Sequence, residues 1–111
     1  MISLFVFACQ YEDYLDLLLD SMAPSPHGGA GPTPLVRSGT VILADNVLWK
    51  GRVLGVAAQA GVVPAGEDKA AKRDRVLAQA MHEFNVKVRK DQRLEQVVLP
   101  LRDGLSIIRV L

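Results

Sequence analysis

Cysteine is almost missing from this sequence: among 111 residues there is one, Cys9. A single cysteine excludes an internal disulfide and cannot build a cysteine-based zinc site. The composition therefore favours a reducing compartment, and we expect a cytoplasmic location. At this length the chain can form one small domain at most.

An excess of charge of either sign is also lacking. The 13 Lys and Arg residues face 12 Asp and Glu residues, which leaves a formal net charge of +1. This balance provides no electrostatic footprint for a nucleic acid or an anionic membrane. Long apolar runs are missing too: a membrane-spanning helix needs about 20 apolar residues, and the opening MISLFVFAC is short for a signal peptide and has no preceding Lys or Arg. We therefore expect no nucleic acid and no membrane among the partners.

What is present begins with an apolar run at residues 2–9, which predicts a strand covered on both faces. Residues 11–22 have helical periodicity, with acids opposite an apolar stripe. Residues 23–34 are rich in proline and glycine and predict a loop insertion. A second apolar strand is expected at about 39–45. In the predicted helix at 11–22, the apolar stripe consists of Tyr14, Leu15, Leu18 and Met22.

The second half of the chain continues the alternation. Residues 55–66 predict an irregular connection, and 68–90 predict a long helix. Its apolar stripe consists of Leu77, Met81, Phe84 and Val88. Strands at about 93–101 and 104–110 are joined by an Asp-Gly turn signal, as in a hairpin. The order β-α-β-α-β-β predicts an α/β sheet covered on both faces, with parallel strands and a C-terminal antiparallel hairpin.

One polar pair interrupts the apolar stretch VILADNVLWKGRV at residues 41–53. Asp45 and Asn46 follow the second strand, and ligands of open α/β sheets bind at the carboxyl ends of the strands. A carboxylate and a carboxamide oxygen are hard ligands that suit Mg²⁺ or Ca²⁺. Trp49 could form the wall of a pocket for a flat aromatic substrate. The structural alternative is that Asp-Asn is an ordinary turn or helix-capping pair.

Three segments resemble one family. The stretch LVRSGTVILADNVLWKGRV is similar to the "PGG-hydrophobic-DN-V/T-L-W-x-G-x-V" segment of the cation-dependent O-methyltransferases, the group of the caffeoyl-CoA and catechol O-methyltransferases. EFN at 83–85 resembles that family's "FN", and DQRLEQVVLPLRDGLSIIR resembles its "DPRVE…LPIGDGLTLAR" tail. By this resemblance, residues 1–111 are the C-terminal portion of a class I, Rossmann-like methyltransferase domain.

The resemblance also implies a chemistry. Members transfer a methyl group from S-adenosylmethionine to a hydroxyl of a catechol-like or other phenolic small molecule. Asp45 and Asn46 match two of three protein ligands of a divalent cation, Mg²⁺ or Ca²⁺, and Trp49 matches a residue near the substrate pocket. The cation stabilises the ionised acceptor and orients it, which makes the transfer a positioned displacement.

The sequence departs from the family pattern in three places. Ala8 stands where the family has its third ligand, an acid at a strand end close to the cofactor, so we assign it to the cofactor site by position only. Tyr11 stands where some members have a lysine proposed as general base, and a tyrosine has an ordinary pKa of about 10. No G-x-G-x-G segment follows a strand, and GGAG at 28–31 lies in the Pro-rich loop. We therefore expect the N-terminal cofactor-binding half to be absent and the isolated chain to be inactive. Without the third ligand we expect cation binding to be weak or absent.

Two other interpretations stay open. The first is a non-catalytic interaction module, a pseudoenzyme fragment that uses residues 2–9 as a bare strand edge to pair with a second copy or with a partner. An exposed apolar edge invites such pairing. The second is a small-ligand-binding domain that keeps Asp45, Asn46 and Trp49 without transfer chemistry.

Overall fold

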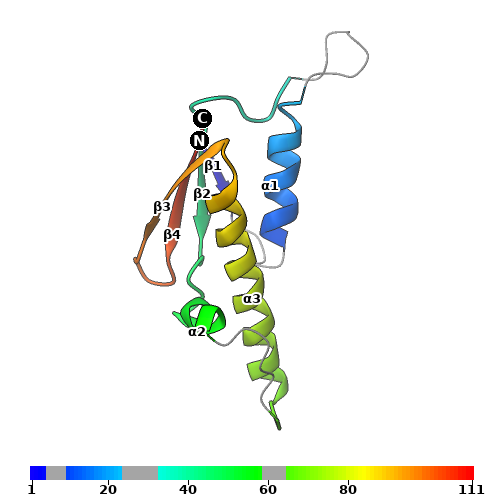
Figure 1. Ribbon diagram of the computed structural model, residues 1–111, viewed down its shortest axis with the longest axis vertical. Coiled ribbons are helices and arrows are strands. Elements are labelled where there is room, and N and C mark those ends of the chain that lie inside the picture. The colour runs from blue at the N-terminus through cyan, green and yellow to red at the C-terminus, as the bar shows by residue number, and fades with distance from the viewer. Residues whose placement is uncertain (5–9, 24–32, 59–64) are drawn as a thin grey trace.

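The computed structural model describes residues 1–4, 10–23, 33–58 and 65–111. It contains two long helices, one short helix and a sheet (Figure 1). No helix in these ranges is long and apolar enough to cross a membrane. The elements in chain order are β1 (Ile2–Leu4), α1 (Tyr11–Asp20), β2 (Val41–Asp45), α2 (Arg52–Ala58), α3 (Lys69–Lys90), β3 (Leu94–Leu99) and β4 (Leu105–Val110).

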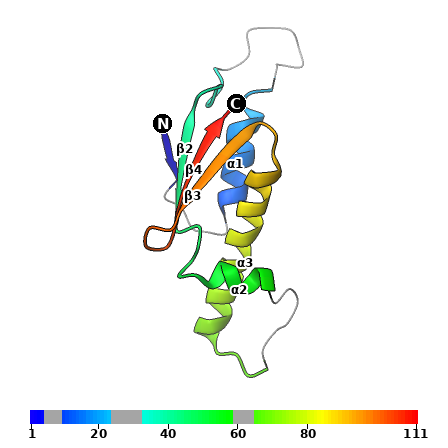
Figure 2. The ribbon, with the colours of Figure 1, turned by 60° about the vertical axis from the view of Figure 1, so that its left-hand side comes forward.

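The four strands form one sheet in the order β1-β2-β4-β3 (Figure 2). Strands β1 and β2 are parallel, and β4 runs antiparallel to both of its neighbours. The returning strand of the hairpin is thus inserted between β2 and β3, with Ile107 opposite Leu43 on one side and Val97 on the other. The expected α/β class, with parallel first strands and a C-terminal antiparallel hairpin, is confirmed.

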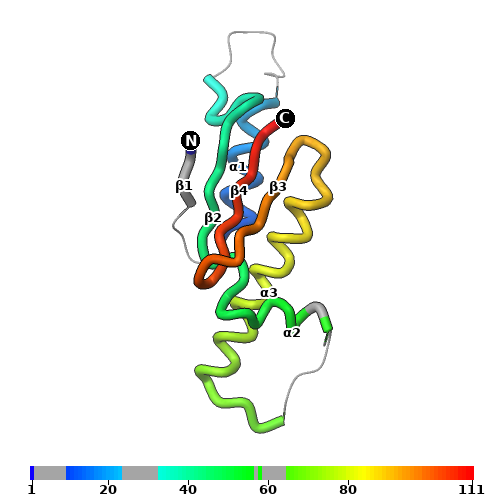
Figure 3. The backbone as a smooth tube through the Cα atoms, turned by 90° about the vertical axis from the view of Figure 1, so that its left-hand side faces the viewer, coloured from blue at the N-terminus to red at the C-terminus, as the bar shows by residue number. Residues whose placement is uncertain are grey.

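Helices α1 and α3 lie on the same face of the sheet (Figure 3). Along β2, Ile42 and Ala44 are buried under the helices, whereas Val41 and Leu43 on the opposite face are partly exposed. The expectation of a sheet covered on both faces is therefore wrong for the part of the chain that the structure describes, because both long helices pack on one side. The shared core consists of Tyr11, Leu15, Leu18, Leu19, Val36, Ile42, Ala44, Val47, Val53, Met81, Phe84, Val88, Leu94, Ile108 and Val110.

Two further expectations need correction. Residues 55–66 were predicted to be irregular, but α2 covers Arg52–Ala58, and residues 59–64 lie outside the described ranges. Gly55 obscured this short helix in the sequence, because glycine is a poor helix former, while Val53 anchors the helix in the core. Tyr14 was assigned to the buried stripe of α1 but is 38% exposed, because the stripe is centred instead on Leu15 and Leu19.

Most other element boundaries match within two residues. The Pro- and Gly-rich insertion predicted at 23–34 lies mainly in residues 24–32, and the end of the first predicted strand lies in 5–9; both segments are outside the described ranges. The turn at Arg102–Asp103–Gly104 joins β3 to β4, as the Asp-Gly signal predicted. Arg102 and Gly104 both have a positive φ there, 50° and 90°.

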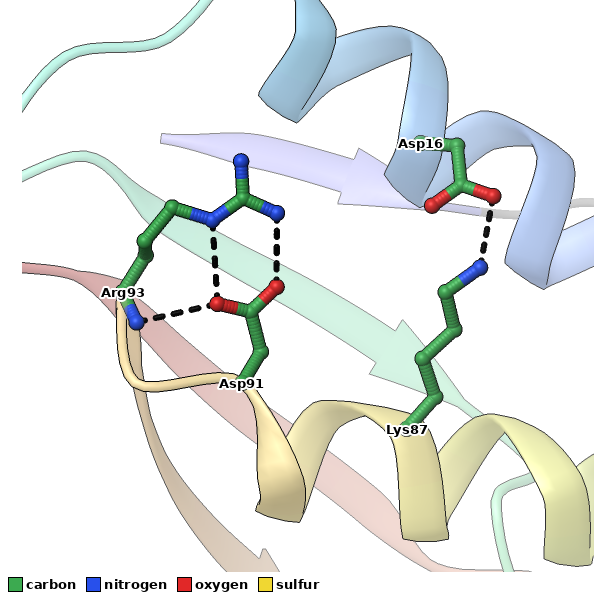
Figure 4. Close-up of polar contacts among 4 residues, drawn as sticks. All are labelled: Asp16, Lys87, Asp91 and Arg93. Carbon is green, nitrogen blue, oxygen red and sulfur yellow. Dashed lines mark hydrogen bonds and ion pairs between the residues drawn. The ribbon is translucent and has the colours of Figure 1, made fainter.

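Polar side chains fix the two ends of α3. Asp68 is its N-cap, and the carboxylate accepts a hydrogen bond of 2.7 Å from the Ala71 backbone N–H. At the other end Lys87 forms an ion pair with Asp16 of α1, and the Asp91 carboxylate binds the Arg93 guanidinium (Figure 4). The ion pair between Lys87 and Asp16 links the two helices that cover the sheet.

Candidate functional site

Asp45 and Asn46 lie at the carboxyl end of β2, where the sequence placed them. Asp45 is the last residue of the strand and is partly buried, and the next residue, Asn46, is exposed. Asn46 has a φ of 59°, a left-handed conformation that asparagine tolerates better than most residues. The Asp45 carboxylate accepts a hydrogen bond of 2.8 Å from the Asn46 backbone N–H through Oδ1. The second carboxylate oxygen and the Asn46 carboxamide make this an oxygen-rich end of the strand.

The segment that follows turns tightly before α2. Trp49 and Lys50 have φ values of 42° and 54°, and the Trp49 backbone N–H donates to the carbonyl of Asn46 at 3.0 Å. The Trp49 side chain is partly buried and packs against the core. Its indole Nε1 is buried and has no hydrogen-bond partner among the described residues. Trp49 therefore lies one turn beyond the Asp-Asn pair, and no described residue accepts a hydrogen bond from its indole N–H.

Tyr11 reaches the pair from the first turn of α1. Its side chain is buried, with 1% exposure, and its hydroxyl donates a hydrogen bond of 2.9 Å to the backbone carbonyl of Asp45. Its ring lies against Phe84 of α3, with 5.2 Å between the centroids and 54° between the planes. Tyr11 thus contacts the backbone of the candidate ligand Asp45.

Asn85 of α3 reaches the same segment from the other helix. Its Nδ2 donates a hydrogen bond of 2.8 Å to the carbonyl of Val47, and its Oδ1 is buried without a partner in the described part of the chain. The sequence interpretation attached no role to Asn85, although EFN at 83–85 was one of the matched segments. The available signal was a polar residue directly after Phe84 of the apolar stripe, within a segment that resembled the family.

The turn between β3 and β4 supports the segment from a third direction. The Leu48 backbone N–H donates to the carbonyl of Asp103 at 2.8 Å, and that of Val47 donates to the carbonyl of Gly104 at 3.3 Å. Residues 45–48 are therefore held by α1, by α3 and by the hairpin turn, which are far apart in the sequence.

The donor set suits a hard divalent cation. Mg²⁺ usually keeps several waters and binds proteins through one or two carboxylates, so one carboxylate and one carboxamide are a sufficient start. Among the residues that the structure describes, no three His, Cys, Asp or Glu side chains come together as a metal site. Ala8, predicted at the position of the third ligand and of cofactor contact, lies outside the described residues.

Sequence comparison assigns the chain to a family. The profile described as O-methyltransferase matches residues 32–111, a range that includes the Asp-Asn pair and both strands of the hairpin. The chain therefore belongs to the O-methyltransferase family. Ala8 and Tyr11 precede the matched range.

Individual relatives agree with this assignment. Tricin synthase 2 of Oryza sativa subsp. japonica is 35% identical over 77 residues, which are 68% of this chain and 23% of the relative. A methyltransferase of Podospora anserina, PaMTH1, solved with bound SAH, superposes with a TM-score of 0.71 at 24% identity over 99% of this chain and 40% of that one. A putative caffeoyl-CoA O-methyltransferase of Staphylococcus aureus superposes with a TM-score of 0.52 at 24% identity, covering 93% of this chain and 48% of that one.

In each comparison the match covers a large share of this chain but a much smaller share of the other protein. The chain spans less than a quarter of the length of the curated relative and less than half of the length of either solved structure. At 24% identity the solved structures establish the fold alone, and this chain forms part of a Rossmann-like methyltransferase fold. They leave the ligands of this chain to be inferred from its own residues.

Proposed function

We propose that this chain supplies the cation-binding and acceptor-binding edge of an O-methyltransferase. The reaction is transfer of a methyl group from S-adenosylmethionine to a hydroxyl of a catechol-like or other phenolic small molecule. Asp45 and Asn46 hold a divalent cation, Mg²⁺ or Ca²⁺, and Trp49 contacts the aromatic acceptor. The observation that carries this proposal is the oxygen-rich pair at the carboxyl end of β2, with its backbone held from three sides.

Family membership supports the reaction type, and the donor chemistry supports the cation. In the transfer, the acceptor hydroxyl would release its proton to solvent and its oxygen would attack the methyl carbon of the sulfonium. The carbon–sulfur bond would break, and its electron pair would stay on sulfur in S-adenosylhomocysteine. A cation at this site would lower the pKa of an acceptor hydroxyl. Asp45 and Asn46 then act by holding the acceptor in one orientation, and orientation supplies much of the rate of a two-substrate reaction.

Binding of S-adenosylmethionine needs a kind of segment that this chain lacks. The sequence of this chain contains no glycine-rich segment of the G-x-G-x-G type after a strand, which is the usual phosphate- or cofactor-binding turn of such folds. We therefore propose that S-adenosylmethionine binding requires a glycine-rich βαβ unit in addition to these 111 residues. Within this chain, the acceptor side of the reaction can be tested separately.

The acceptor and cation proposal is tested with the fluorescence of Trp49, the single tryptophan of the sequence. Catechol is titrated into the protein with Mg²⁺ and with a chelator. We expect saturable quenching that requires Mg²⁺ and is lost in Asp45→Ala. Asp13→Ala, which removes an exposed carboxylate from α1, should behave as the wild type. Quenching that persists with the chelator or in Asp45→Ala would contradict the assignment.

A non-catalytic interaction module is the second candidate. The observation that favours it is the place of β1 at the end of the strand order, which makes it an edge strand in the described sheet. On this alternative a second copy or a partner adds a strand beside β1. A dimer in sedimentation equilibrium, combined with no catechol or Mg²⁺ response of Trp49, would favour the module over the methyltransferase.

A further inference from the structure

The segment after β2 adopts a conformation that needs outside support. Asn46, Trp49 and Lys50 all have a positive φ although none of them is glycine. Residues other than glycine keep such conformations only where the surrounding structure holds them. The direction in which Asp45 and Asn46 present their oxygens therefore depends on what holds their backbone.

Two side chains bind that backbone on either side of Asn46. The Tyr11 hydroxyl donates to the carbonyl of Asp45 at 2.9 Å, and the Asn85 carboxamide donates to the carbonyl of Val47 at 2.8 Å. One comes from α1 and the other from α3. Asn46 is thus flanked by two carbonyl groups, each fixed by a different helix.

The two contacts are also connected to each other. Phe84, the residue before Asn85, packs its ring against the ring of Tyr11. Both rings are buried, with exposures of 1% for Tyr11 and 0% for Phe84. Displacement of either helix would therefore disturb both hydrogen bonds together.

We propose that Tyr11 and Asn85 are positioning residues, which fix the directions of the Asp45 and Asn46 side chains through the carbonyls of Asp45 and Val47. This inference rests on the proposed function for the role of the Asp-Asn pair. It differs from a catalytic role for Tyr11 at the lysine position, because a hydroxyl that donates to a backbone carbonyl acts through Asp45 and not on the acceptor. Partners that orient metal ligands typically change metal affinity by about 10- to 100-fold when removed.

The first experiment needs no cation. Amide hydrogen exchange is measured by NMR in Tyr11→Phe, which removes only the hydroxyl, and in Asn85→Ala. We expect exchange at Leu48 and Trp49 to rise about tenfold while exchange at Ile42 and Ile108 in the centre of the sheet stays unchanged. Tyr14→Phe and Gln79→Ala are the matched controls, because they change exposed residues of the same two helices. Unchanged exchange at Leu48 and Trp49 would overturn the proposal.

The second experiment measures Mn²⁺ dissociation constants by calorimetry for the same variants and for Asp45→Ala. We expect Tyr11→Phe and Asn85→Ala to weaken binding about tenfold each. The ratio of the dissociation constants of Tyr11→Phe and wild type should be the same at about pH 6 and about pH 8, because the proposed contact is a hydrogen bond to a backbone carbonyl. A ratio that changes with pH would overturn the positioning role, because a hydrogen bond to a backbone carbonyl would not account for it.

The two proposals fail in distinguishable ways. If Asp45→Ala loses Mn²⁺ binding while Tyr11→Phe and Asn85→Ala bind as the wild type does, the positioning role is wrong and the cation site stands. If the wild type and Asp45→Ala bind Mn²⁺ equally, or neither binds it, the proposed cation site is wrong. In that case the exchange rates at Leu48 and Trp49 still decide whether Tyr11 and Asn85 hold the segment.

Discussion

A Cβ atom on Gly104 would lie 2.5 Å from Cγ of Leu48 and 2.9 Å from its backbone nitrogen. This close approach joins the hairpin turn to the segment that carries the Asp-Asn pair. Gly104 also has a φ of 90°, a backbone conformation that residues with a side chain rarely adopt. We expect Gly104→Ala to lower the free energy of unfolding by about 2–4 kcal/mol, from strain and overpacking together. Urea denaturation followed by circular dichroism measures this loss.

Gly39→Ala is the matched control for that substitution. Gly39 has a similar φ of 86°, but a Cβ there would meet nothing within 4 Å. Only the backbone strain applies, so we expect a loss of about 1 kcal/mol. Equal losses at the two positions would mean that Leu48 moves away without cost, and that the contact with Gly104 does not position the segment.

The pH dependence of stability should report on Asp91 and Arg93. The Arg93 side chain donates hydrogen bonds of 3.0 and 2.7 Å to the two carboxylate oxygens of Asp91, and this holds the pKa of Asp91 below its ordinary value. A carboxylate with a lowered pKa stabilises the fold above its unfolded pKa of about 3.9, and this contribution disappears as the pH falls through the folded pKa. Below that range the protonated carboxyl no longer distinguishes the two states.

Arg93→Gln should therefore reduce the free energy of unfolding by about 0.5–1 kcal/mol at neutral pH, the usual range for an ion pair at the surface. The difference from the wild type should shrink as the pH falls below about 4 and vanish once Asp91 is protonated in the folded state as well. Arg89→Gln, at an exposed position on the last turn of α3, is the control for loss of one positive charge. A wild-type advantage that persists unchanged in acid would show that Arg93 stabilises the chain by packing and not through Asp91.

Much of this fold could be predicted from the sequence because local patterns agreed with each other. The stripe Met81, Phe84 and Val88 in α3 and the Asp-Gly signal before β4 correspond to the buried helix face and to the hairpin turn. The single-sided packing of the sheet could not be predicted in this way. An apolar run such as 41–44 has the same composition whether one face or both are covered, and Leu43 is partly exposed although its sequence context is entirely apolar.

Ala8→Asp should strengthen cation binding if Ala8 occupies the position of the missing acidic ligand. The number of ligand charges is a main determinant of affinity for hard cations, so adding a second carboxylate to Asp45 and Asn46 should lower the dissociation constant for Mg²⁺ by about tenfold or more. A millimolar-scale titration of the two proteins measures the change. Equal binding by wild type and Ala8→Asp would place residue 8 away from the site.

The isolated chain should show no methyl transfer. The glycine-rich turn is absent from its sequence, and we infer from the sequence resemblance that Ala8 and Tyr11 stand at the positions of the family's acid and lysine. Without an oriented cofactor the reaction loses the contribution of positioning, worth about 7–11 kcal/mol in well-aligned systems. The assay uses labelled S-adenosylmethionine, catechol and Mg²⁺, with Asp45→Ala as the control. Turnover that depends on Asp45 would show that these residues suffice or that a second copy completes the site.

Of the candidate site, too, only a part could be predicted from the sequence. The location of Asp45 and Asn46 followed from a strand that ends in polar residues and from the rule that sites lie at carboxyl ends of strands. The hydrogen bonds from Tyr11 and Asn85 did not follow, since each joins residues more than 30 positions apart and uses a backbone carbonyl as acceptor. A backbone acceptor cannot be recognised in a sequence, because every residue has a backbone carbonyl. The packing of α1 against α3 brings the Tyr11 hydroxyl and the Asn85 carboxamide to these carbonyls.

The insertion of β4 between β2 and β3 has a consequence for biosynthesis. Every other described element leaves the ribosome before β4, yet β2 and β3 have no direct pairing with each other and are bridged only by that strand. Translation proceeds at about 5–20 residues per second. The edges of β2 and β3 that pair with β4 therefore stay unpaired for a time that is long compared with hairpin formation. The nascent chain is therefore most exposed to misassembly just before its last described strand appears, and a ribosome-associated chaperone would have its greatest effect there.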